Sequence, residues 1–370
     1  MAPFTNDIDD EAEFEAEYAS YTCGNGIEQL TQDVANLTLS SVNPKNEHGS
    51  APARQVQARI SDKTSDKLQI TYQLMTLINQ AKFNGSIITT WFGHHDFAAR
   101  PSRQIARGGY FQTRLAEGLG VAKYPLLATE SKELSERSYK ALAKELRVLA
   151  HPPLMNHENI VNIKTIGWTR LDASSAAWMP MIVLELADLG TLTEYLSKER
   201  LGVDSKLQIA RDVGCGLQAL HACGITHGDL KLDNILMFMG KGGKVQAKLC
   251  DFGCSYIMTG DENEEDKVEI SAGTKPWNSP ELYKQIPNPW LPHVDTYSFG
   301  LLVWRIFLNG RNPFEGLEEE DIDRRKAQDL IVSDASLSIE DEYDRIIVLR
   351  GAVTSTNRAL YKGATIKVCF

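Results

Sequence analysis

The segment that decides the fold is residues 226–234, with the sequence THGDLKLDN. A short apolar run at 234–239 and an alternating apolar run at 244–250 follow it, separated by a glycine-rich turn. Two such runs around a glycine-rich turn predict a β-hairpin. Pairing of the two strands would bring Asn234, at one outer end of the hairpin, close to Asp251, which follows the other end.

The polar residues at this end of the hairpin suit phosphate and magnesium chemistry. Asp229, Lys231 and Asn234 stand within six residues of one another, and Asp251 faces them across the predicted hairpin. Carboxylate and carboxamide oxygens are hard ligands for Mg²⁺, an ammonium group screens phosphate charge, and a carboxylate can accept a hydroxyl proton. Either half alone could be a solvated loop, but the two halves together favour a site for phosphate transfer.

With the triplet Asp-Phe-Gly at 251–253, this segment resembles the catalytic and metal-binding motifs of the eukaryotic protein kinase family. The resemblance covers about residues 100–316. It implies an α+β, bilobal protein-kinase-like fold, with a small β-rich N-lobe that contains one helix and a mainly helical C-lobe. It also implies transfer of the γ-phosphate of ATP to a protein hydroxyl, with ATP and Mg²⁺ as cofactors.

The resemblance also implies roles for the residues of these two motifs. Asp229, Lys231 and Asn234 belong to the catalytic loop. By the resemblance, Asp229 is the catalytic base and Lys231 neutralises the charge of the γ-phosphate. Asn234 and Asp251 would bind the Mg²⁺ that bridges the nucleotide phosphates.

Upstream, the sequence Gly-Val-Ala-Lys at 120–123 is similar to the family strand whose lysine contacts the α- and β-phosphates. The segment 139–149 has apolar residues at helical spacing, which predicts an amphipathic helix. Glu145 lies on that helix. The resemblance makes it the ion-pair partner of Lys123.

The loop that covers the nucleotide in the family matches residues 105–113, where Gly108 and Gly109 are candidate phosphate-binding residues. Only the middle glycine of the family's three, Gly108, is retained, because Ala106 and Phe111 occupy the other two positions. Glycine lets backbone amides approach a phosphate closely. We expect Phe111 to lie at a hairpin tip that tolerates its size.

The apolar segment 181–187 predicts a buried strand that leads into the hinge between the lobes. By position, Leu184 would be the gatekeeper residue. The carbonyl of Glu185 and the amide of Ala187 would contact the adenine edge.

Downstream, residues 273–281 resemble the end of an activation segment, which forms the platform for a peptide substrate. Lys231 and Thr274 together favour serine or threonine over tyrosine as the acceptor. A helix over 205–223 and a helix at 295–308 that is apolar all round are predicted as scaffold, and the second must be buried.

Gly228 occupies the place of the family's arginine, so the catalytic loop is of the non-RD type. That arginine holds a phosphorylated activation loop through charge-assisted hydrogen bonds. Its absence predicts activity that does not depend on phosphorylation within 254–273.

After residue 316 the match to the family's last helices is lost, and the C-lobe is predicted to be shortened or atypical. An acidic, helix-like run at 318–323 follows. Arg350 and Arg358 are the candidates, on placement alone, for the arginine that pairs with Glu281 in the family.

The domain prediction has three parts: a disordered acidic tail at 1–60, a helical and extended segment at 61–98, and a kinase domain at 99–370. Residues 1–20 contain seven carboxylates and no Lys or Arg. Such a tail can bind a basic partner, although a solubilising role is the simpler interpretation. Within 61–98 we expect a helix at 65–81 and a strand at 87–92. This stretch either packs on the following domain or presents a surface to a partner, and we favour packing.

The formal net charge of −10 argues against a nucleic-acid-binding protein, because phosphate contacts need a basic face. No apolar run is long enough to span a membrane, and the acidic N-terminus is unlike a signal peptide. We expect an intracellular protein, cytoplasmic or nuclear, with reduced thiols. Cys250 is expected to be a small buried residue rather than a reactive thiol.

Three functions are compatible with these motifs. The first is an active serine/threonine protein kinase, a transferase. The second is a pseudokinase, which the altered glycine loop favours. The third is a small-molecule phosphotransferase, because His-Gly-Asp-Leu also resembles the catalytic loop of aminoglycoside and choline kinases, although those enzymes lack the 274–281 platform. We favour the active kinase because all five chemical positions are present, namely Lys123, Glu145, Asp229, Asn234 and Asp251.

Overall fold

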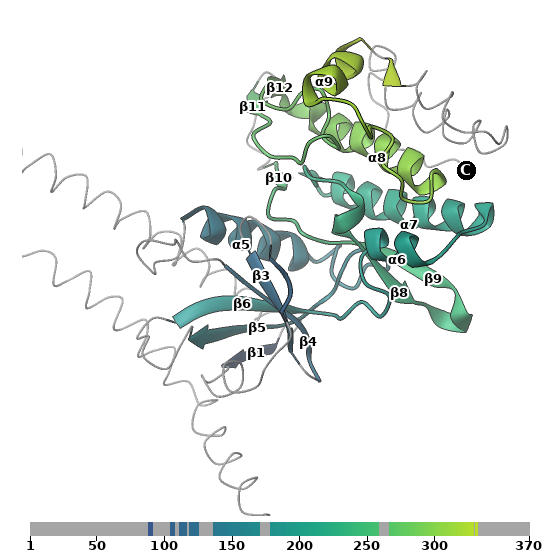
Figure 1. Ribbon diagram of the computed structural model, residues 1–370. Helices are drawn as coiled ribbons and strands as arrows, with labels where there is room; N and C mark the ends of the chain where they lie inside the picture. The colour runs from purple at the N-terminus through teal and green to yellow at the C-terminus, as the bar shows by residue number, and fades with distance from the viewer. Residues whose placement is uncertain are drawn as a thin grey trace, which may run out of the picture. The chain divides into compact units, whose positions relative to one another are not determined.

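The computed structural model describes residues 88–91, 104–107, 111–116, 118–125, 136–170, 178–258, 266–328 and 330–331. Within these residues a β-rich N-lobe with one helix stands beside a mainly helical C-lobe (Figure 1). This is the α+β, bilobal architecture that the sequence predicts. The predicted tail at 1–60 and the helix at 65–81 lie outside the described residues.

The N-lobe is a six-stranded sheet in the order β1-β5-β6-β4-β3-β2. Its strands are β1 (Ile88–Trp91), β2 (Gln104–Arg107), β3 (Phe111–Ala116), β4 (Gly120–Pro125), β5 (Ile163–Arg170) and β6 (Trp178–Leu184). Strand β1 pairs in parallel with β5, whereas the other neighbours are antiparallel. The strand expected at 87–92 therefore joins the sheet of the domain that follows it.

Helix α5 (Glu136–Leu149) is the helix of this lobe. Leu142, Leu146 and Leu149 are buried along one stripe, as the periodicity predicts. Full burial of each such side chain contributes about 1.5–3 kcal/mol. The stripe fixes the rotation of the helix about its axis and leaves Glu145 fully buried beside β4.

The C-lobe contains four described helices and three two-stranded sheets. The helices are α6 (Leu192–Lys198), α7 (Val203–Ala222), α8 (Leu291–Phe307) and α9 (Glu319–Ala327). The strand pairs are β8 (Ile235–Met239) with β9 (Val245–Leu249), β7 (Ile225–Thr226) with β10 (Tyr256–Ile257), and β11 (Lys267–Glu269) with β12 (Gln285–Pro287).

Helix α8 is the centre of the C-lobe, and nearly all of its residues are buried, as its continuous apolar run predicts. It begins at Leu291, one turn before Asp295, because Pro292 is well suited to the first turn of a helix. It ends before Asn309 and Gly310, which have φ values of 52° and 83°. None of the helices in the described part of the chain is both long and apolar enough to cross a membrane.

Candidate active site

The hairpin β8–β9 assembles the catalytic loop as the sequence predicts. Ile235 pairs with Leu249, and the amide of Cys250 donates to the carbonyl of Asn234 at 3.0 Å. This register places Asn234 and Asp251 at the same end of the hairpin. Cys250 itself is buried, and burial raises the pKa of its thiol far above the ordinary value, so it is not a reactive thiolate.

Lys123 lies at the centre of an ion network between the lobes, in which Lys123 and Glu145 are buried and the side chain of Asp251 is 44% exposed. Its Nζ donates to both carboxylate oxygens of Glu145, at 2.9 and 2.6 Å, and to Oδ1 of Asp251 at 2.9 Å. The Lys123–Glu145 pair predicted from the motif is therefore present. Asp251 has a φ of 64°, a left-handed conformation that is uncommon outside glycine and that occurs often at functional sites.

The charges of this network control its protonation. Burial alone would lower the pKa of Lys123, but the charges of Asp251 and Glu145 raise it well above its ordinary value. Burial raises the pKa of Glu145 to about 7, against the opposing effect of Lys123. Burial also tends to raise the pKa of Asp251, yet Lys123 holds it below its usual value, so Asp251 stays an anion.

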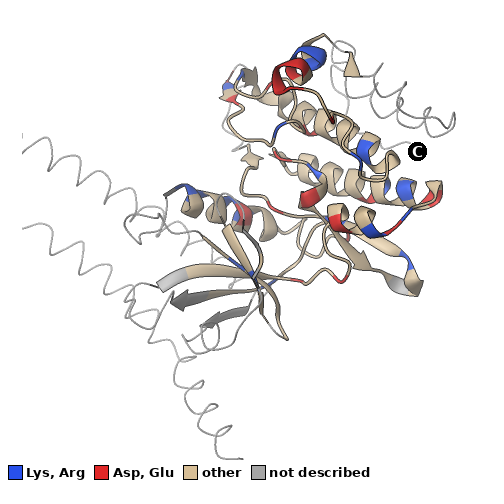
Figure 2. Ribbon diagram, viewed as in Figure 1, with Lys and Arg blue, Asp and Glu red and all other residues tan. Residues whose placement is uncertain are grey.

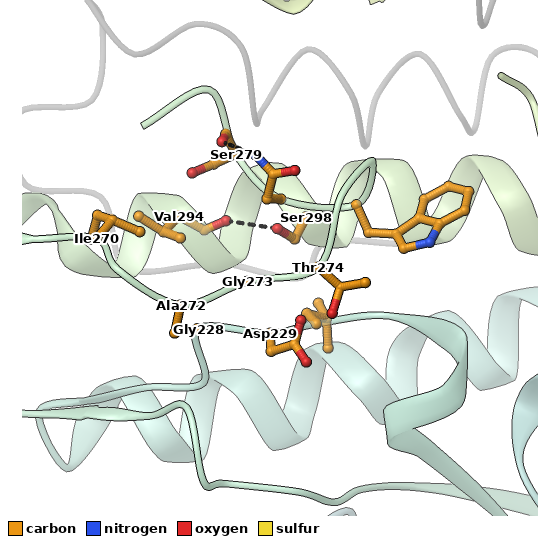
Figure 3. A pocket seen from close by; sticks show the side chains of 12 residues that line it. Gly228, Asp229, Ile270, Ala272, Gly273, Thr274, Ser279, Val294 and Ser298 are labelled. Atoms are coloured by element: carbon orange, nitrogen blue, oxygen red, sulfur yellow. Dashed lines mark hydrogen bonds between the residues drawn. The ribbon is translucent and has the colours of Figure 1, made fainter. Parts of the chain in front are cut away.

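Lys231 joins the catalytic loop to the platform loop, residues 274–281. Its Nζ donates to Oδ2 of Asp229 at 2.8 Å and to Oγ1 of Thr274 at 2.7 Å. Figure 3 shows Thr274 next to Asp229, at a pocket that both residues line. Asn234 also holds Asp229 in place. Its Nδ2 donates to the backbone carbonyl of Asp229 at 2.7 Å and to the carboxylate oxygen Oδ2 at 3.2 Å.

Asp295 binds the backbone of the catalytic loop, a role that the sequence did not indicate. It is 1% exposed on α8 and accepts hydrogen bonds from the amides of His227, at 2.7 Å, and Gly228, at 2.9 Å. Nε2 of His221 contacts the same carboxylate at 2.8 Å. Burial would raise the pKa of Asp295, but the hydrogen bond and charge of His221 hold it below its ordinary value.

Phe111 begins the strand that follows the β2–β3 connection, so its place near a hairpin tip agrees with the expectation, but its side chain is buried. It is the first residue of β3 and is 5% exposed. The Nζ of Lys123 lies 4.3 Å from the centre of its ring, and a Cβ added at Gly253 would come within 3.1 Å of the ring edge. The ring thus covers the ammonium group of Lys123. The candidate residues Gly108 and Gly109 lie outside the described residues.

Leu184 is buried and ends strand β6, as the predicted buried strand requires, and its gatekeeper role stays a prediction. The side chain of Glu185 is bound by two donors. Its Oε1 accepts from the amide of Asn162 at 2.8 Å and from Nζ of Lys248 at 2.7 Å. Ala187 follows as a half-buried residue whose carbonyl accepts from the amide of Gly190 at 3.4 Å. The adenine contacts of Glu185 and Ala187 stay predictions.

The donor set fits a magnesium ion that is held largely by nucleotide phosphates. Among the described residues, no group of three or more His, Cys, Asp or Glu could hold a metal alone. Mg²⁺ in such sites takes one or two carboxylates and completes its shell with phosphates and water. The Nδ2 of Asn234 is held by Asp229, which leaves Oδ1 of Asn234 as an oxygen ligand at the same end of the hairpin as Asp251.

A family model described as "Protein kinase domain" matches residues 122–349 of this chain. The chain belongs to the protein kinase family. The matched residues include all the catalytic-loop and metal-binding positions described above. The kinase boundaries 99–370 predicted from the sequence stay a prediction.

Curated relatives of this kinase differ in the acceptor that their names give. A serine/threonine/tyrosine-protein kinase of Arabidopsis thaliana is 29% identical over 60% of this chain and 51% of its own length. A probable serine/threonine-protein kinase of Encephalitozoon cuniculi is 35% identical over 45% of this chain and 27% of its own. The tyrosine-protein kinase SYK of Gallus gallus is 29% identical over 40% of this chain and 23% of its own. The matched region thus spans about half or less of these relatives.

The kinase match continues past residue 316, where the motifs become hard to recognise. Helix α9, whose acidic start and basic end are visible in Figure 2, packs against the platform loop. The Nζ of Lys326 donates to the carbonyls of Pro276 and Asn278, the second at 2.8 Å. Lys275 forms ion pairs with Glu319 and Asp323 on the same helix.

The predicted pairing of Glu281 with an arginine stays a prediction. Glu281 is half-buried rather than fully buried. Arg350 and Arg358, the candidates for its partner, lie outside the described residues. In the described region, Lys275 and Lys326 connect the platform loop to α9, and the sequence did not single them out.

Proposed function

We propose that this kinase transfers the γ-phosphate of ATP to a serine or threonine hydroxyl of a protein substrate, with Mg²⁺. The observation that carries the proposal is the bridge made by Lys231, which contacts Asp229 and Thr274 at 2.8 and 2.7 Å. It joins the candidate base, the candidate phosphate-neutralising group and the substrate platform in one cluster. Such a cluster places a hydroxyl and a transferred phosphate within reach of the same two side chains.

In the proposed reaction, Asp229 accepts the proton of the substrate hydroxyl as its oxygen bonds to the γ-phosphorus. The bond from the γ-phosphorus to the bridging oxygen breaks, and ADP leaves. Lys231 offsets negative charge on the transferred group, while Lys123, held by Glu145, faces the nucleotide phosphates. Mg²⁺, when bound at Asn234 and Asp251, would supply further charge neutralisation.

The direct test is transfer of radiolabelled phosphate from ATP with Mg²⁺ to a generic basic protein, with phosphoamino-acid analysis of the product. The variant Asp229→Asn keeps the shape of the side chain and removes the base. We expect label on serine and threonine, and a loss of about 10²–10⁴-fold in kcat for the variant. Equal transfer by the variant would contradict the assignment of Asp229 as the base. Label on tyrosine alone would contradict the assignment of serine and threonine as acceptors.

We also propose that this activity does not require phosphorylation of the segment 254–273. The geometry of Gly228 supports this. Its φ is 81°, and a Cβ there would lie 2.7 Å from the carbonyl oxygen of Cys254, so no arginine fits this backbone. Alanine variants at Ser255, Thr259 and Ser271 should keep activity. Ser255 is fully buried, so its variant is first checked for folding by thermal melting.

A second candidate function, a pseudokinase that binds without transferring phosphate, is favoured by one observation. The ring of Phe111 covers the ammonium of Lys123, which is the group that would face the phosphates. If purified protein transfers no phosphate but is stabilised by ATP, this second function is the better one. Stabilisation by ATP together with transfer to a small molecule would instead indicate a small-molecule phosphotransferase.

A further inference from the structure

Tyr256 lies where three parts of the site meet. It belongs to β10, which pairs with β7 directly before the catalytic loop, at the register Tyr256 to Thr226. Its hydroxyl accepts a hydrogen bond from the amide of Ser271 at 2.8 Å, and the amide of Ala272 approaches it at 3.3 Å. One side chain therefore holds the segment that leads into the platform loop.

The same ring also contacts the catalytic loop. Gly228 has no side chain, and the edge of the Tyr256 ring fills the space beside it, since a Cβ added there would lie 3.2 Å from Cε2. The two residues are complementary, because any side chain at 228 would displace the ring or the carbonyl of Cys254. The aromatic side chain of Tyr256 on β10 thus fills the space that a side chain at position 228 would need.

A third contact reaches the helix of the N-lobe. The Nζ of Lys144 lies 5.6 Å from the centre of the Tyr256 ring, within the range of a cation–π interaction. Lys144 precedes Glu145, which pairs with Lys123. The ring also packs against the small apolar cluster of Ile270, Leu291 and Val294, so its position is fixed by packing and not by the hydroxyl alone.

We propose that Tyr256 is a positioning residue that takes the place of a phosphorylated residue in the activation segment: its neutral hydroxyl fixes the approach to the peptide platform while its ring contacts the catalytic loop and α5. This inference deepens the proposed function and rests on it. A neutral acceptor that bonds two backbone amides needs no added charge. The platform is therefore held in place as soon as the chain folds.

The variant that isolates the hydroxyl is Tyr256→Phe, which keeps the ring and its packing. The matched control is Tyr283→Phe, the same chemical change at a side chain that is 69% exposed in the same lobe. Two measurements are made on the full chain. The first is steady-state kinetics with myelin basic protein and ATP, and the second is hydrogen–deuterium exchange of the amides at 270–274.

We expect the Tyr256→Phe variant to raise the KM for the protein substrate about fivefold, the size of one lost neutral hydrogen bond. The KM for ATP should stay unchanged, and the amides of Ser271 and Ala272 should exchange faster. The Tyr283→Phe control should match the wild type in both measurements. Phosphatase treatment of the wild type should leave its activity intact.

Three results would overturn the inference. The first is unchanged amide exchange at 271–272 in the Tyr256→Phe variant. The second is a similar deterioration of kcat and of both KM values, which would indicate a general structural role. The third is loss of wild-type activity after phosphatase treatment. Failure of the proposed function gives a different result, because the contact of Tyr256 with the amides at 271–272 can be measured by hydrogen–deuterium exchange even in a protein without transferase activity. Faster exchange in that inactive protein would support the contact and reject the kinase activity.

Discussion

Two buried lysines hold the two halves of the site, and their surroundings differ. Lys123, on the proposed nucleotide side, contacts two carboxylates, whereas Lys326, on the proposed peptide side, donates to the carbonyls of Pro276 and Asn278. Burial acts to lower both pKa values. The carboxylates raise the pKa of Lys123 above its ordinary value, but the pKa of Lys326 falls to about 8.

The difference shows what keeps a buried ammonium charged. Paired anions offset the loss of hydration, while carbonyl dipoles do so only in part. The nucleotide side is therefore an ionic network that fails when one member is removed. Lys326 instead makes hydrogen bonds to backbone carbonyls, each of which contributes less. The predictions below test this contrast.

The largest effect is expected for Lys123→Met. The variant leaves Glu145 facing Asp251 without the cation between them, and breaking a buried ion pair in this way costs about 3–5 kcal/mol. Phosphate transfer should be lost, and the melting temperature should fall. Thermal unfolding checks this. A variant as stable as the wild type would show that the network contributes nothing to folding.

A paired substitution sharpens the same test. Replacing Lys123 and Glu145 together by methionine removes both the cation and the fully buried carboxylate. This double variant should be more stable than Lys123→Met alone, because less uncompensated charge remains buried. If it is equally unstable, the loss comes from packing and not from charge.

Phe111→Ala is expected to cost about 3 kcal/mol of stability, because a buried aromatic side chain is lost. The same change uncovers the ammonium of Lys123, so ATP with Mg²⁺ should raise the melting temperature of the variant more than that of the wild type. Phe111→Leu, which keeps apolar bulk, should fall between the two. A smaller ATP-induced shift in Phe111→Ala would mean that the ring helps to bind the nucleotide.

The motifs predicted from sequence are those in which spacing alone determines the contact. Lys123 and Glu145 meet because a strand and an amphipathic helix each have one buried face, and the hairpin brings Asn234 to Asp251 by register. The burial of the Phe111 ring was not predicted, because a sequence does not say to which face of the sheet the first residue of a strand points. The pairing of β3 with β4 decides that.

Asp295 and Lys326 were missed for a related reason. An Asp near the start of a helix is usually interpreted as a cap. Helix α8 begins one turn earlier, however, and the side chain of Asp295 contacts the catalytic loop. Lys326 lies in a run of charges that reads as a solvated face. A signal was present, since Ile322 lies four residues earlier and shares its buried side of α9.

Asp295→Asn tests the support of the catalytic loop. Each carboxylate oxygen accepts from a backbone amide, so in the asparagine variant an NH₂ group must face one of the donors His227, Gly228 or His221. We expect a loss of about 1–3 kcal/mol in stability and a lower kcat. ATP affinity, measured by calorimetry, should not change. A selective loss of ATP affinity would contradict this placement of Asp295.

The smallest effect at neutral pH is expected for Lys326→Met, because the lost hydrogen bonds are offset by removal of a buried charge. Its signature is in the pH dependence. Burial lowers the pKa of Lys326 to about 8, so between about pH 8 and the ordinary lysine value the unfolded chain binds more protons than the folded chain. Stability from this group must therefore rise with pH, by at most about 1.4 kcal/mol per pH unit.

Between pH 7.5 and 9.5, the wild type should gain stability relative to Lys326→Met in thermal unfolding. Lys284→Met, at an exposed lysine of the same lobe, provides the control and should follow the wild type. Parallel curves for the wild type and Lys326→Met would mean that the two carbonyls keep the ammonium charged as well as carboxylates do. The contrast between the two lysines would then not hold, because Lys326 would keep its buried charge without a directly paired carboxylate.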